Sequence, residues 1–199
     1  LESDIYIIMV SIMCITGIFI MEYRTGMIKI LNTTPKGKKY TAKNKIKVCL
    51  LASLIIFAIS IVPEIIKIGE IYGFSNVTAS ITSMSEFSNL PTTISILEYI
   101  VIMYMIRFIV FDSIILFILW ISFKLKNTTY TILATSSILL IPIILTQLKF
   151  EFANVISVSQ MLNVSKILLS GQNLYWLYLI IPIVLGGCFY KSLCKNFGK

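Results

Sequence analysis

The chain has 199 residues, of which 57% are hydrophobic and only 13% charged, and its formal net charge is +8. Soluble domains are about 45–50% apolar and about 25% charged, so this composition excludes a soluble globular domain, a disordered tail and a disulfide scaffold. There is no histidine, and the four cysteines have no paired spacing. The apolar composition predicts an integral membrane protein. Because histidine, the commonest general base and metal ligand, is missing, we expect no catalytic, cofactor-binding or metal-binding residues.

Runs of residues without charges mark the segments that can cross a bilayer, because an ionised side chain is costly in hydrocarbon. Five spans are predicted, at residues 5–21, 48–68, 99–123, 127–148 and 173–190. The second span reaches residue 68 if Glu64 and Lys67 lie at the interface with their stems turned outward. The prediction is therefore a single all-α transmembrane domain over residues 1–199, with outer segments at 69–98 and 149–172.

Positive charges are distributed unevenly between the two sides that these spans define. Residues 22–47 carry eight lysines and arginines against one acidic residue, and further lysines follow the third and fifth spans. The charged residues of segment 64–98, on the other side, are four glutamates and one lysine. Cytoplasmic loops are enriched in lysine and arginine, so we predict that the N-terminus lies outside and the C-terminus inside. The abundance of Ile, Lys and Asn with few Ala indicates an AT-rich bacterial genome, so the membrane expected is a bacterial plasma membrane.

The order of residues within the basic segment 22–47 predicts a short amphipathic helix and a turn. Apolar residues recur at i, i+4, i+7 and i+8 on one helical face: Tyr23, Met27, Ile30 and Leu31. Pro35 ends this helix because the residue before a proline is pushed away from helical angles. We then expect a turn at 36–39 and a helix capped by Thr41 that runs into the second span. Such a helix either lies among the lipid headgroups or docks a cytoplasmic partner.

The segment 22–39, EYRTGMIKILNTTPKGKK, resembles the loop of type-two ATP-binding-cassette exporter permeases, in which an acidic residue, a glycine, a short apolar helix and Thr-Pro follow a span at its inner face. The resemblance covers under a tenth of the chain and maps onto Glu22, Gly26, Leu31, Thr34, Pro35 and Lys43. It implies a coupling helix that docks a separate cytoplasmic ATPase subunit. The docking residues implied are Glu22, Tyr23, Gly26, Met27, Ile30, Leu31, Thr34 and Pro35.

The resemblance also implies a six-span layout of which this chain holds the second to sixth spans, and the initial Leu1 favours the later part of a longer protein. Residues 149–172 occupy the place of re-entrant helices in that family, although one amphipathic helix on the outer leaflet explains their apolar character equally well. Gly37-Lys38 is not followed by the Ser or Thr of a phosphate-binding loop. ATP hydrolysis is therefore expected in a separate subunit, which would bind ATP and Mg²⁺. The resemblance implies two permease copies, identical or different, in the lipid bilayer, and no nucleic acid.

Two charged residues, Arg107 and Asp112, interrupt the third span. A spacing of five residues places them about 140° apart around a helix, so they do not form an easy ion pair with each other. We expect each to find a partner elsewhere or to face an aqueous cleft. Both a substrate or gate contact and a structural role between helices remain open for this pair.

Two further classes of protein compete with the permease interpretation. A membrane protein without transport activity, such as an assembly or immunity factor, would use the basic loop to bind lipid or a partner. An intramembrane enzyme is disfavoured, because histidine is missing and no two acidic residues have catalytic spacing within a span. The transported substrate has no signature in the sequence.

Overall fold

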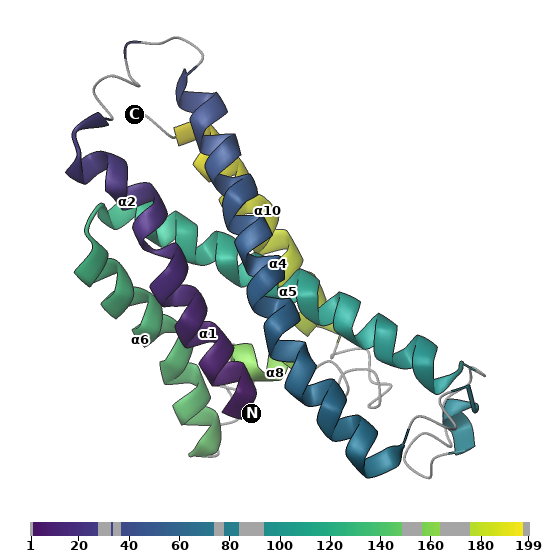
Figure 1. Cartoon of the computed structure of the whole chain (residues 1–199). Helices are drawn as coiled ribbons and strands as arrows, with labels where there is room; N and C mark the ends of the chain where they lie inside the picture. Colours follow the sequence, from purple (N-terminus) through teal and green to yellow (C-terminus); the bar gives the residue numbers. More distant parts are fainter. Residues whose placement is uncertain are drawn as a thin grey trace.

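The computed structural model describes residues 2–27, 33, 37–73, 78–83, 94–148, 157–163 and 176–196. Within these ranges the chain is all-helical, apart from an isolated antiparallel bridge between Ser80 and Ser95 (Figure 1). In the same ranges four helices are long and apolar enough to cross a membrane: Ile5–Arg24, Tyr40–Glu70, Ile96–Leu125 and Thr128–Gln147. They match the first four predicted spans.

The first span consists of two helices, α1 (Glu2–Ile15) and α2 (Gly17–Arg24), which follow each other in nearly the same direction (Figure 1). Thr16 lies between them and keeps helical backbone angles, with its N–H bonded to the carbonyl of Ile12 at 3.2 Å. Its carbonyl accepts the buried hydroxyl of Ser122 at 2.7 Å. The span therefore extends beyond the predicted residue 21 and is tied at its middle to another helix.

Helix α4 (Gly37–Tyr72) contains the second span and is 36 residues long. The predicted turn at 36–39 and the predicted cap at Thr41 are wrong, since residues 37–41 are already helical. Lysine is a good helix former, so the run of basic residues continues the span helix instead of interrupting it. Pro63 lies inside α4 without ending it.

The third and fourth spans, α5 (Ile96–Leu125) and α6 (Thr128–Gln147), form a tight helical hairpin. Helix α5 begins with a capping box, in which the Glu98 N–H donates to Ser95 Oγ at 3.3 Å and the Ser95 N–H donates to Glu98 Oε2 at 3.1 Å. It ends at Leu125, and its C-cap, Lys126, has left-handed backbone angles (φ 54°). Asn127 then caps α6. The two-residue connection holds the end of α5 beside the start of α6.

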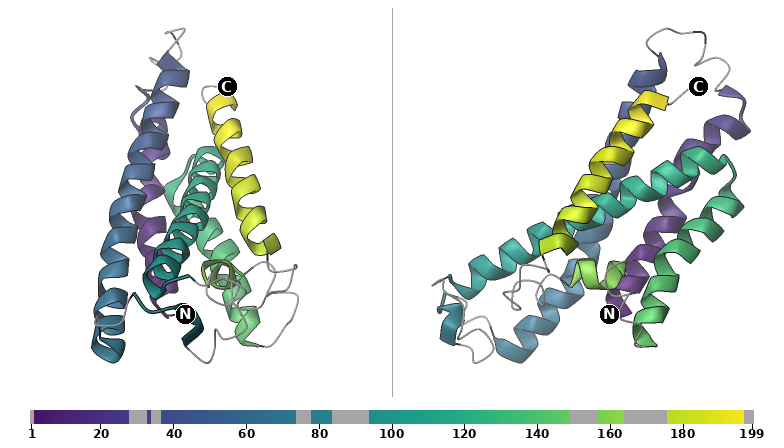
Figure 2. Two further views of the ribbon diagram at one scale, coloured as in Figure 1. Left: turned by 90° about the vertical axis from the view of Figure 1, so that its right-hand side faces the viewer. Right: turned by 180° about the vertical axis from the view of Figure 1, so that it is seen from behind.

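Helix α10 (Trp176–Asn196) lies along α5 (Figure 2). A Cβ atom at Gly186 would come within 2.9 Å of Ser113 Oγ, so only glycine permits this close approach. The Phe189 ring lies 5.2 Å from the ring of Trp120. Helix α10 covers most of the predicted fifth span at 173–190 but is not among the four helices above, and the count of five spans stays a prediction.

The outer segment predicted at 149–172 is described only for residues 157–163, which contain the short helix α8 (Val158–Leu162). Val158 and Leu162 are buried against the core cluster. Whether the whole segment is re-entrant or interfacial lies outside the described residues. Figure 2 shows that α1 begins and α10 ends at opposite ends of the bundle.

Charges are segregated along the bundle. The ends of α2, α5 and α10 and the start of α4 lie toward one end (Figures 1 and 2), and they carry Arg24, Lys43, Lys45, Lys47, Lys124, Lys191 and Lys195. The end of α4 and the start of α5 lie at the other end and carry Glu64, Glu70 and Glu98 against Lys67. We call the first of these the basic end.

Candidate functional site: the basic end and the charged pairs

At the basic end an ion pair joins the first two spans. Lys45 Nζ lies 2.9 Å from Glu22 Oε1, and the two side chains are only 17% and 13% exposed. Lys45 also donates to the carbonyl of Ile18 at 2.5 Å, and its ammonium lies 5.3 Å from the centre of the Phe19 ring. The Lys45 side chain thus contacts α2, so the two helices that flank residues 25–36 are joined near the end of α2 and about two turns inside the start of α4.

The end of α2 separates two residues that the sequence placed on one helical face. Tyr23 belongs to α2, which ends at Arg24, and Gly26 then adopts φ +71°, a conformation that favours glycine. Met27, which follows this break, is helical again. The prediction that Tyr23 shares an amphipathic face with Met27 is therefore wrong. The Tyr23 ring instead lies under Lys126 Nζ, 4.9 Å from its centre.

Of the predicted docking residues, Glu22, Tyr23, Gly26 and Met27 are described. Met27 is 56% exposed although its side chain is apolar. Ile30, Leu31, Thr34 and Pro35 lie outside the described residues. The structure therefore places the first half of the predicted segment at the basic end, with Glu22 turned inward to Lys45 and Met27 turned outward.

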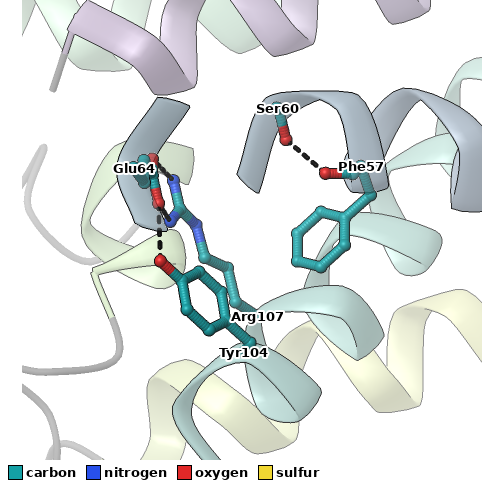
Figure 3. Close-up of polar contacts among 5 residues, drawn as sticks. All are labelled: Phe57, Ser60, Glu64, Tyr104 and Arg107. Atoms are coloured by element: carbon teal, nitrogen blue, oxygen red, sulfur yellow. Dashed lines mark hydrogen bonds and ion pairs between the residues drawn. The ribbon is translucent and has the colours of Figure 1, made fainter. Parts of the chain in front are cut away.

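At the opposite end, Arg107 of α5 meets Glu64 of α4. Arg107 donates through Nη1 to Glu64 Oε2 at 2.6 Å and through Nη2 to Glu64 Oε1 at 3.1 Å. Tyr104, one turn earlier on α5, donates its hydroxyl to Glu64 Oε2 at 3.2 Å. Figure 3 shows both α5 side chains pointing at the same carboxylate. The Arg107 and Glu64 side chains are 11% and 24% exposed, so the pair is largely shielded.

An aromatic cluster lies next to this ion pair. The Phe57 ring of α4 is 5.2 Å from the ring of Phe108 and 5.8 Å from the ring of Phe111, both on α5. Ser60 donates to the carbonyl of Phe57 within α4 at 2.7 Å (Figure 3). Apolar rings therefore separate the ion pair from the next polar contact along the seam between α4 and α5.

That next contact is made by Asp112. Ser53 Oγ of α4 donates to Asp112 Oδ1 at 2.6 Å and is itself fully buried. A hydroxyl donor satisfies one carboxylate oxygen without bringing a second charge into the span. Both charged residues of the third span thus find partners on α4, which is one of the two alternatives that the sequence left open.

Sequence reasoning missed the partners on α4, namely Lys45, Ser53 and Glu64. A signal for them was present, because Lys45, Cys49, Ser53, Phe57, Ser60 and Glu64 follow one another at spacings of four or three residues. Such spacing places all six on one face of a helix. A polar stripe on an otherwise apolar helix predicts a face buried against other helices, not one exposed to lipid.

No family model, curated protein or solved structure matches this chain. The described part of the molecule defines a class of protein nonetheless: a helical bundle with several helices apolar enough for a multi-pass integral membrane protein. Outward-facing apolar residues on α4, such as Leu51, Ile55 and Ile59, are exposed as a lipid-facing surface requires.

Proposed function

We propose that the chain is the membrane-spanning permease subunit of an ATP-binding-cassette exporter, which forms the translocation path and docks a separate ATPase subunit through residues 22–35. The observation that carries the proposal is the joint at the basic end, where Glu22 and Lys45 clamp α2 to α4. Because this ion pair joins the two spans, a displacement of the loop by a bound partner would move both spans together. Without the ion pair, the same displacement could change the loop alone.

The exposed Met27 side chain supplies an apolar contact at this joint. Burial of a large apolar side chain stabilises a complex by about 1.5–3 kcal/mol, whereas an exposed charge pair contributes about 0–1 kcal/mol. Docking that depends on the loop therefore draws its free energy mainly from Met27 and Leu31, and the surrounding lysines add long-range attraction.

The test first asks whether the adjoining gene encodes an ATP-binding-cassette ATPase, and then whether that ATPase co-purifies with this chain. Replacing Met27 and Leu31 together by Ser is expected to release that ATPase and to abolish transport-coupled hydrolysis, while membrane insertion stays unchanged. Replacing Lys38 and Lys39 by Gln is the matched control and is expected to weaken association only mildly. Loss of the ATPase with the lysine variant but not with the Met27 and Leu31 variant would leave a membrane protein that binds lipid or a partner electrostatically.

A further inference from the structure

A cavity of about 300 Å³ lies between α5, α6, α8 and α10. Its walls are formed by apolar residues from all four helices, including Ile114, Phe117, Leu139, Val158, Pro182 and Phe189. Such a volume lies at the lower limit of pockets that hold small ligands. No step of the proposed function uses it.

The chemistry of the walls excludes water as a stable occupant. Ser113 is the polar residue among the described lining residues, and its hydroxyl already donates to the carbonyl of Ile109 at 3.0 Å. A buried water needs two to four polar partners, and apolar cavities without them stay dry. An empty space of this size would also forfeit dispersion contacts along its whole lining, which close-packed protein interiors avoid.

The position of the mouth identifies what can enter. Leu185 lines the cavity and is 46% exposed, and its neighbours Ile183 and Val184 on α10 are exposed apolar residues as well. Because an apolar side chain of the cavity wall is exposed at the surface of the bundle, like the outward-facing apolar residues of the other spans, we infer that the cavity opens toward hydrocarbon. Leu139 lies eight residues before the end of α6, which places the cavity about 12 Å inside that end of the helix.

We propose that this cavity binds one acyl chain of a bilayer phospholipid, inserted between α8 and α10 past Leu185. A flexible hydrocarbon chain has the polarity that the walls require and is the most abundant apolar ligand at that depth of a membrane. The chain packs against Phe189, whose ring is in contact with Trp120 at 5.2 Å. It thereby fills the space between α8 and α10 and holds the two helices at their present separation.

The contact with Trp120 supplies the probe. The chain has two tryptophans, so the Trp176→Phe variant reports on Trp120 alone. Reconstituted into vesicles of phosphatidylcholine brominated at mid-chain, this protein is expected to lose Trp120 fluorescence in proportion to the brominated fraction. Two variants fill the cavity from different helices, Leu185→Phe at the mouth and Met161→Phe on α8, and each is expected to at least halve that quenching.

The matched control is Ile183→Phe, which adds the same bulk to an exposed position of α10 outside the cavity and is expected to leave the quenching unchanged. Native mass spectrometry of the detergent-purified protein gives a second readout, in which one retained phospholipid is lost in both filling variants but not in the control. Because the two filling substitutions lie on different helices, the test still gives a result if one of the two variants does not fold. Quenching that is the same in both filling variants as in the parent would overturn the proposal, since the brominated chains would then be quenching Trp120 from outside the cavity.

Discussion

Arg107 on α5 gives both terminal guanidinium nitrogens to the carboxylate of Glu64 on α4, at 2.6 and 3.1 Å. Two parallel hydrogen bonds fix the direction as well as the distance between the groups, which a single lysine contact does not. Tyr104 donates to the same carboxylate at 3.2 Å. This end of the seam between α4 and α5 is therefore held in one register by a charged group from each helix.

The first prediction concerns single and paired removal of these charges. Arg107→Leu leaves the Glu64 carboxylate without its cationic partner, and loss of one member of a buried pair costs about 3–5 kcal/mol. Partial exposure lowers this cost, so a loss of about 2–3 kcal/mol is expected in thermal unfolding of the detergent-solubilised protein. Arg107→Glu is expected to be worse, because two carboxylates would face each other.

The paired change Glu64→Leu with Arg107→Leu is the control. Replacing both partners by apolar groups is often neutral or stabilising, so the double variant is expected to unfold at or above the temperature of the parent. Additive destabilisation, in which the double change costs as much as Arg107→Leu and Glu64→Leu together, would show that the two residues act independently and that the ion pair is not the source of the effect.

The spans were predictable from sequence because hydrocarbon tolerates few charges, and the break at Arg107 and Asp112 was informative for the same reason. Their partners were harder to predict, since Glu64 lies 43 positions from Arg107 and only the packing of α4 on α5 brings them together. The helix at 37–41 and the break at Gly26 depend on local backbone angles. The turn predicted at 36–39 and the helical face predicted to contain Tyr23 and Met27 were therefore wrong.

A second prediction tests the closest approach between helices. An Ala at position 186 would place its Cβ 2.9 Å from Ser113 Oγ and 3.2 Å from Ser113 Cβ, so α10 must move away from α5. Gly186→Ala is expected to destabilise the protein by about 1–3 kcal/mol, as overpacking does. Gly187→Ala is the adjacent control, since nothing lies within 4 Å of its added Cβ.

Ser113→Gly provides the complementary change. It removes the atoms that the new Cβ would strike, so the double variant with Gly186→Ala is expected to recover part of the lost stability in thermal unfolding. If Gly187→Ala is as harmful as Gly186→Ala, helix flexibility explains the glycines, and the contact with Ser113 does not.

The third prediction is topological and uses the two ends of α4. Lys43 and Glu70 are exposed on this helix and are separated by about 40 Å. In a background with the four native cysteines replaced by alanine, Glu70→Cys is expected to react with an impermeant thiol reagent added to intact cells. Lys43→Cys is expected to react only after the membrane is opened. Labelling of Lys43→Cys in intact cells would reverse the orientation and remove the basis for docking a cytoplasmic ATPase.

The last prediction separates coupling from stability at the basic end. Lys45→Met breaks the bond to Glu22 Oε1, and the buried Glu22 Oε2 has no hydrogen-bond partner among the described residues, so within them the whole carboxylate becomes unpaired. A loss of about 2–3 kcal/mol is expected, below the range for fully buried pairs because solvent screens this one partly. Lys43→Met, an exposed neighbour on the same helix, is expected to change stability by less than about 0.5 kcal/mol.

A charge exchange at this pair should not restore the parent. Lys45 also donates to the carbonyl of Ile18, and a carboxylate at position 45 would face that oxygen without a proton to share. If the chain is the permease subunit proposed above, Glu22→Lys with Lys45→Glu is therefore expected to give ATPase activity without transport, whereas Glu22→Met with Lys45→Met is expected to recover stability but not transport. Full transport by the double methionine variant would mean that the clamp only stabilises the fold, and force from a docked ATPase would then have to reach α4 by another contact.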